Sequence, residues 1–122
     1  MIETYFWEIE QTISYFKNIL TYNLYSQVYN DKQGFIKGKI TFNDKKVLLF
    51  SEVKDIEISS KIKYRYHYME ENKSLIFRYD NAKHHKSIAS FPFHKHIKNE
   101  VSESKEVSLY DVLLEISKFN RE

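Results

Sequence analysis

The sequence contains no cysteine, one proline and two glycines among its 122 residues. The lack of cysteine excludes disulfide bonds, thiolate catalysis and zinc sites built on cysteine, and it fits a reducing compartment. Two glycines are too few for the glycine-rich loops that hold phosphates in dinucleotide-binding and P-loop folds. The sequence therefore excludes a disulfide-stabilised domain and nucleotide-binding folds of that type.

Long hydrophobic runs are also missing. No segment approaches the roughly 18 consecutive apolar residues of a membrane-spanning helix. The first ten residues, MIETYFWEIE, carry acids where a secretion signal carries Lys or Arg. We therefore expect a cytoplasmic protein that does not bind membranes. With 42% hydrophobic and 16% aromatic residues, the chain has enough apolar surface to fold as a single domain over residues 1–122.

Hydrophobic periodicity predicts a helix followed by strands. Apolar residues recur at every third or fourth position from Ile2 to about Tyr22, Phe16 and Leu20 among them, which indicates one buried helix face. Residues 24–29, 35–42 and 47–53 are rich in β-favouring residues. The second of these segments alternates apolar and polar residues, as a strand with one solvated face does.

The C-terminal segment predicts a second helix that begins at Ser108. Asp111 follows three residues later, close to a capping box. The expected buried stripe comprises Leu109, Val112, Leu113, Ile116 and Phe119. Residues 99–106 are polar and charged, so we expect a connection there. A helix, an antiparallel sheet of about five to six strands and a C-terminal helix give an α+β fold class.

Residues 61–98 hold all five histidines and both arginines that lie outside the C-terminal tip. By count, this segment has nine Lys or Arg against three Asp or Glu, a net charge of +6. The remainder of the chain therefore carries −4, because the whole chain is +2. This asymmetry indicates where a functional site should be sought.

Residues 61–81 predict a β-hairpin. A loop centred on Glu71 and Asn72 would give one aromatic and apolar face, with the pairs Tyr68–Leu75, Tyr66–Phe77 and Tyr64–Tyr79. The opposite face would carry the pairs His67–Ile76, Arg65–Arg78 and Lys63–Asp80. Two arginines that face each other repel, so an anion such as phosphate would be a natural ligand for this face.

The remaining histidines lie in two flanking elements. His84 and His85 occur in a stretch with no helical or strand period, which predicts a loop. His94 and His96 would point to one side of an extended segment and Lys95 to the other. Pro92 favours an edge strand or a strand start at this place.

Histidines beside cations provide the groups needed to cleave a phosphodiester bond without metal. One imidazole takes the proton of the attacking 2′-hydroxyl, another protonates the leaving oxygen, and a cation stabilises the phosphoryl charge. The expected catalytic residues are His67, Arg78, His84, His85, His94 and His96. The expected binding residues are Arg65, Asp80 and Lys95.

The same residues allow other functions. His94 and His96 could bind zinc or another transition metal, with Asp80 or a further histidine as third ligand. A His-x-His pair alone is a weak signal, however, and we predict neither a metal nor another cofactor. A protein that only binds nucleic acid or protein through the cationic hairpin face is the alternative to an enzyme, and Lys37 and Lys39 could extend that face.

Three motifs in this segment are similar to those of the TumE family, toxins of bacterial and archaeal toxin–antitoxin pairs. They are YxYHY at 64–68, FRYDNAxHH at 77–85 and FPxHKH at 91–96, and the resemblance extends over the whole chain. Many relatives have proline where this chain has Lys83 and another histidine where it has Phe93. The second departure suggests that position 93 is not essential to the family.

The resemblance implies a growth-inhibiting toxin that is neutralised by contact with a cognate antitoxin of helix-turn-helix type. It does not imply a mechanism. Because toxins of such pairs often attack RNA, we expect by analogy an RNA target and a small, metal-independent ribonuclease. The oligomeric state stays open, with a dimer as one option.

Overall fold

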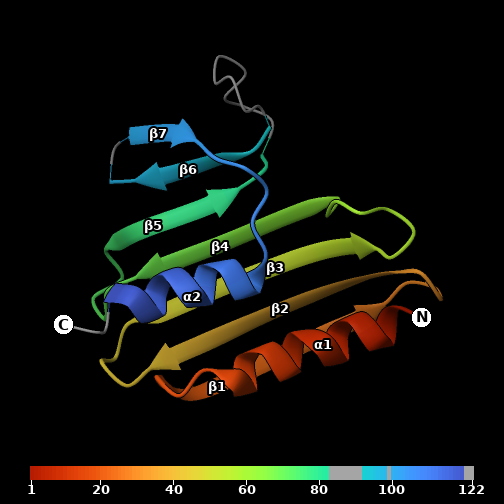
Figure 1. Ribbon diagram of the computed structural model, residues 1–122, viewed down its shortest axis with the longest axis horizontal. Helices are drawn as coiled ribbons and strands as arrows, with labels where there is room; N and C mark the ends of the chain where they lie inside the picture. The colour runs from red at the N-terminus through yellow and green to blue at the C-terminus, as the bar shows by residue number, and fades with distance from the viewer. Residues whose placement is uncertain (83–91, 99, 120–122) are drawn as a thin grey trace.

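The computed structural model describes residues 1–82, 92–98 and 100–119. The elements in this part of the chain (Figure 1) are α1 (Ile2–Tyr15), β1 (Ile19–Val28), β2 (Gln33–Phe42), β3 (Val47–Asp55), β4 (Lys63–Met69), β5 (Leu75–Asp80), β6 (His94–Ile97), β7 (Glu100–Glu103) and α2 (Leu109–Phe119). They form one sheet of seven strands in chain order, with every neighbouring pair antiparallel. The expected α+β class is confirmed, with seven strands in place of five or six. Neither helix is long and apolar enough to cross a membrane.

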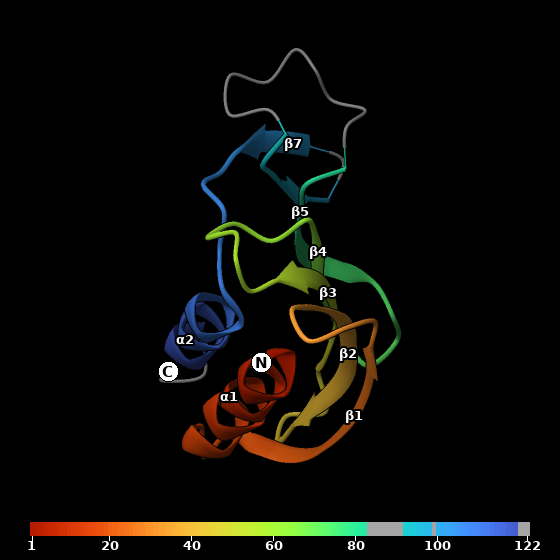
Figure 2. The same ribbon diagram turned by 90° about the vertical axis from the view of Figure 1, so that its right-hand side faces the viewer.

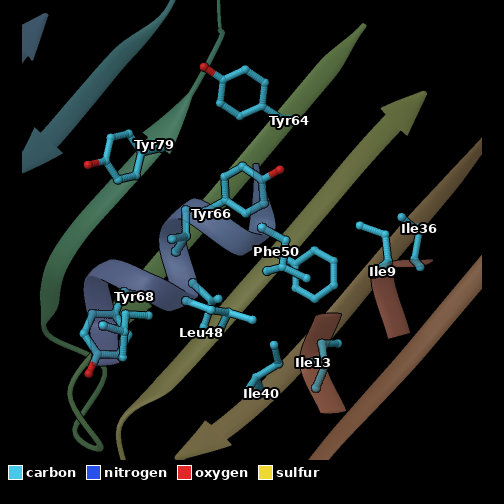
Figure 3. Packing of buried hydrophobic residues seen from close by; sticks show 14 of the residues in the cluster. Ile9, Ile13, Ile36, Ile40, Leu48, Phe50, Tyr64, Tyr66, Tyr68 and Tyr79 are labelled. Atoms are coloured by element: carbon cyan, nitrogen blue, oxygen red, sulfur yellow. The ribbon is translucent and has the colours of Figure 1, made fainter. Parts of the chain in front are cut away.

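Both helices lie on the same face of the sheet, and Figure 2 shows the other face without a helix over it. The helices contribute a buried apolar stripe each: Ile2, Phe6, Ile9 and Ile13 from α1, and Leu109, Val112, Leu113 and Ile116 from α2. The sheet contributes aliphatic and aromatic side chains that face the helices, and Figure 3 shows many of them. Burying these side chains on one face leaves the opposite face of the sheet available for polar groups.

The first helix ends earlier than predicted. It stops at Tyr15, Phe16 is extended (φ −96°, ψ 121°), and β1 begins at Ile19. Residues 16–22 combine apolar spacing that suits a helix with aromatic and β-branched residues that suit a strand. Pairing with β2 decides in favour of the strand. Leu20, expected on the buried helix face, is consequently 63% exposed.

The C-terminal third departs from the prediction in two places. Residues 100–103 form the edge strand β7, so β6 is an internal strand of the sheet and the polar connection contains a strand. In α2 the predicted cap is confirmed, since Asp111 N donates to Ser108 Oγ at 3.1 Å and Ser108 N donates to Asp111 Oδ2 at 3.0 Å. Phe119, predicted to be buried, is 58% exposed because it lies at the very end of the helix.

The register of the β4–β5 hairpin differs from the prediction by two residues. The observed pairs are Arg65–Asp80, Tyr66–Tyr79, His67–Arg78 and Tyr68–Phe77. A two-residue shift keeps each side chain from Phe77 to Asp80 on its predicted face, so the aromatic face is confirmed there. Ile76, predicted on the polar face, packs against the core instead. The predicted Arg65–Arg78 pair is wrong, and Arg65 instead lies opposite a carboxylate.

The turn and a bulge in β5 together cause this shift, and each contributes one residue. Glu70 N donates to Ser74 O, and Lys73 N donates to Glu70 O, which closes a turn with Lys73 in the left-handed region at φ 74°. Met69 pairs with Leu75 while Tyr68 pairs with Phe77, so Ile76 is the extra residue. The alternation of apolar and polar residues alone cannot distinguish such a turn with a bulge from a hairpin loop that has an even number of residues and no bulge.

Candidate functional site

The helix-free face displays two adjacent rows of side chains that cross all seven strands. The pairing of neighbouring strands sets the first row as Asn23, Lys39, Leu49, His67, Arg78, His96 and Val101. It sets the second row as Tyr25, Lys37, Ser51, Arg65, Asp80, His94 and Glu103. Residues far apart in the sequence are thereby placed side by side on one surface.

Asp80 organises the half of these rows that lies on β5 and β6. Its Oδ1 accepts a hydrogen bond from Ala82 N at 3.1 Å and lies 2.5 Å from His94 Nε2. Its Oδ2 accepts from Arg78 Nε at 2.9 Å and lies 3.4 Å from His96 Nε2. Asp80 is only 5% exposed. This buried carboxylate therefore holds two imidazoles and a guanidinium in one network.

His94 is engaged through both ring nitrogens. Its Nδ1 lies 2.8 Å from the carbonyl oxygen of Pro92, which can only accept, so Nδ1 carries a proton. Its Nε2 lies 2.5 Å from Asp80 Oδ1. Because His94 is only 1% exposed, this contact with the carboxylate is shielded from water.

His67 differs from the histidines of β6. Burial, together with the positive charges of Arg65 and Arg78, lowers the pKa of His67 from its ordinary value of 6.5. Its imidazole is therefore mostly neutral at pH 7. The Nδ1 atom is buried and has no hydrogen-bond partner within residues 1–82, 92–98 and 100–119. His67 is thus a neutral imidazole beside two cations, and a neutral imidazole can accept a proton.

A groove of about 500 Å³ opens over β1 to β4, and its lining includes Tyr25, Lys37, Lys39, Arg65 and His67. Its lining contains no carboxylate. The groove thus has a positive potential and lies directly beside His67. The sequence indicated no role for Tyr25, because its position opposite Lys37 depends on how β1 pairs with β2.

Asp80, His94 and His96 could together hold a metal ion. One ligand atom from each lies within 4.8 Å of the others. However, the Arg78 guanidinium donates to Asp80 Oδ2 at 2.9 Å, and its Nη2 lies 3.2 Å from His96 Nε2. A metal cation would be repelled by this fixed positive charge and would have to displace its hydrogen bonds. These residues fit a hydrogen-bonded network better than a metal centre.

Six of the nine predicted site residues lie together on the helix-free face: Arg65, His67, Arg78, Asp80, His94 and His96. Lys95 lies on the helix side, where its Nζ donates to Glu115 Oε2 of α2 at 2.9 Å and lies 4.8 Å from the centre of the Tyr79 ring. It therefore links β6 to α2 and does not face the histidines. His84 and His85 lie outside the described residues.

The fold and this face define a small α+β protein whose sheet carries Arg65, His67 and Arg78 side by side on the face that no helix covers. A family model described as Toxin TumE matches residues 4–121. The chain belongs to the TumE toxin family. It is accordingly the toxin of a toxin–antitoxin system, and the membership implies a cognate antitoxin as partner. No curated protein and no solved structure gives a significant match to the chain.

Proposed function

We propose that this toxin is a metal-independent ribonuclease with His67 as general base, Arg78 as the phosphate-binding cation and His96 as general acid. The observation that carries the proposal is that these three residues lie next to one another on β4, β5 and β6 of the helix-free face. Neighbouring strands are about 4.8 Å apart, so the Cα atoms of His67 and His96 are separated by about 10 Å. This separation leaves room for one phosphate group between the two imidazoles.

The proposed reaction uses His67 in its neutral form and His96 in its protonated form. His67 removes the proton from a ribose 2′-hydroxyl, and the oxygen attacks the adjacent phosphorus. A P–O2′ bond forms while the P–O5′ bond breaks, and His96 gives a proton to the departing O5′. The products are a strand that ends in a 2′,3′-cyclic phosphate and a strand that begins with a 5′-hydroxyl. Arg78 and Arg65 stabilise the negative charge that develops on the phosphoryl oxygens.

Asp80 and His94 act as positioning residues in this proposal. Asp80 Oδ2 lies 3.4 Å from His96 Nε2 and accepts from Arg78 at 2.9 Å, so it can orient both the acid and the cation. His94, at 1% exposed, is too buried to touch RNA, whereas His96 keeps 8% of its surface exposed. The contact of His94 with Asp80 holds the carboxylate in place. His84 and His85, expected in the catalytic set from the sequence, receive no role in this arrangement.

The test is cleavage under multiple turnover in the presence of EDTA. Purified toxin is incubated with an excess of labelled RNA, and the ends of the products are identified. We expect more than one cleavage per toxin molecule, cyclic-phosphate ends, and no cleavage of a fully 2′-O-methylated RNA. RNA that stays intact at every time point contradicts the proposal and favours the alternative, an inhibitor that only binds. Activity that is lost in EDTA and restored by zinc would instead indicate a metal centre at Asp80, His94 and His96.

A further inference from the structure

The groove over β1 to β4 is separate from the β5–β6 network and has a composition of its own. We propose that it binds one unpaired nucleotide of a single-stranded RNA, beside the phosphate that is cleaved. This inference rests on the proposed ribonuclease function and extends it to the kind of RNA that is recognised. Three observations support it: the charge of the groove, its exposed apolar wall and its position in the two rows.

The charge of the groove favours a polyanion. Lys37 and Lys39 are exposed on β2, and no carboxylate lies in the lining. Neither lysine forms an ion pair with any residue that the structure describes. Two residues apart on one strand, they are separated by about 7 Å. They can therefore contact successive phosphates of an extended RNA strand.

The apolar wall favours an unpaired base. Tyr25 is 53% exposed and Leu49 is 39% exposed, although both are large hydrophobic residues in the middle of strands. An exposed aromatic ring beside a cationic groove is the usual platform for a base, and bases stack on such rings whatever their identity. A duplex keeps its bases stacked inside, so only an unpaired nucleotide can use this wall. The groove, about 500 Å³ in volume, falls in the range of pockets that hold small ligands.

The groove shares a cross-strand row with the proposed catalytic residues. Lys39, Leu49 and His67 precede Arg78 and His96 in the same cross-strand row. An RNA strand that crosses the sheet from β1 towards β6 would therefore pass through the groove before its phosphate reaches Arg78. An acidic protein segment would pair with the lysines but would have no base to stack on Tyr25, so a loss of binding in Tyr25→Ala favours the nucleotide.

The experiment measures binding without cleavage. A fluorescent, fully 2′-O-methylated RNA is used as a single strand and as a duplex, since blocking the 2′-oxygen prevents the proposed reaction. We expect Lys37→Gln/Lys39→Gln to weaken single-strand binding at low salt and to reduce the slope of log K against log salt by about 1.4, because each phosphate contact contributes about 0.7 for single strands. The control is Lys17→Gln/Lys118→Gln, which removes the same charge from exposed positions outside the sheet and should leave the slope unchanged.

The Tyr25→Ala variant tests stacking. It should weaken single-strand binding on the order of tenfold, within the range found for bases stacked on aromatic rings, and leave duplex binding unchanged. Tyr25→Phe keeps the ring and should bind like the wild type. Equal losses for single strand and duplex, or no loss in Tyr25→Ala, would overturn the nucleotide site.

The outcomes also separate this inference from the proposed function. If wild type cleaves RNA and binds the methylated strand, but the double-lysine variant matches its control, the groove is not the binding site and the ribonuclease proposal stands. If wild type neither cleaves nor binds RNA, the proposed function fails and the inference fails with it. A loss of binding in both groove variants, together with normal behaviour of both controls, is the result that we expect.

Discussion

The two faces of β4 and β5 differ completely, although they alternate along the same residues. The helix side carries buried aromatic rings: Tyr64, Tyr66, Tyr68, Phe77 and Tyr79. The other side carries the polar residues Arg65, His67, Arg78 and Asp80. Because successive side chains of a strand point to opposite faces, a rigid core is built one residue away from each polar group. The core thereby fixes the positions of the proposed reactive groups without touching the ligand.

The titratable groups on the two faces also differ, in the direction in which their pKa values are shifted. On the helix side, Glu52 is 1% exposed and accepts from the hydroxyl of Tyr66 at 2.5 Å and from that of Tyr5. Burial, together with the charge of Glu52, raises the pKa of Tyr66 well above its ordinary value, so this tyrosine stays a donor at any physiological pH. On the other face, the lowered pKa of His67 leaves that ring neutral at pH 7 and able to take up a proton. Tyr66 on the helix side therefore keeps its proton, whereas His67 on the other face can gain and lose one.

The largest effect should come from removing the proposed base on the polar face. His67→Ala should reduce the rate of RNA cleavage at pH 7 by about 10²- to 10⁴-fold, the usual contribution of acid–base catalysis. Because His67 is not a core residue, the unfolding midpoint should change little. Single-turnover cleavage and thermal unfolding measure the two quantities. Lys63→Ala removes an exposed cation from the same face of β4, and a comparable loss there would assign the effect to charge and not to His67.

The next effect concerns Asp80, which lies on the polar face and is nevertheless buried. Asp80→Asn removes the charge that holds Arg78 and both β6 histidines. We expect cleavage to fall on the order of tenfold to a hundredfold through misplacement of these groups. The free energy of unfolding should fall by about 1–3 kcal/mol, because buried partners lose hydrogen bonds. Asp44→Asn in an exposed turn is the matched control. Unchanged cleavage in Asp80→Asn would argue against the positioning role.

A change on the helix side should affect stability alone. Tyr66→Phe removes one of the two hydroxyls that donate to the buried Glu52. The free energy of unfolding should fall by about 1–3 kcal/mol, while the cleavage rate per folded molecule stays the same. Denaturant unfolding and an activity assay at low temperature measure the two effects, with the more exposed Tyr110→Phe as control. A selective loss of cleavage would show that the two faces are not independent.

The smallest effect is a shift in pH dependence. Burial first, and then the charges of Arg65 and Arg78, lower the pKa of His67. Arg65→Gln removes one of these charges, so the pKa of His67 should rise. A base works in its neutral form, and cleavage falls as the pH drops through this pKa. The acid limb of the pH–rate profile should therefore move to higher pH in Arg65→Gln and stay in place in Lys63→Gln. A shift to lower pH would contradict the role of His67 as base.

Local patterns predicted much of the fold and part of the site. Alternation along β4 placed the tyrosines on one face and His67 on the other, and the spacing of Ser108 and Asp111 predicted the cap of α2. These features depend on neighbours within a few residues, so the sequence contains them directly. The end of α1 and the strand β7 were not predicted, because sheet pairing overrode a helical spacing in one case and a polar composition in the other.

The sequence by itself determined that the aromatic and the charged residues of the hairpin lie on opposite faces, and that His94 and His96 share a side. Only the tertiary structure decided which charges meet. The turn and the bulge at Ile76 together brought Asp80 opposite Arg65 and Arg78 beside His67. The pairing of β5 with β6 brought both histidines to Asp80. Side-chain alternation has a fixed period of two, whereas register depends on turns, bulges and partners distant in the chain. For that reason the sequence predicts which face of the sheet each side chain occupies, but not which side chains become neighbours across the strands.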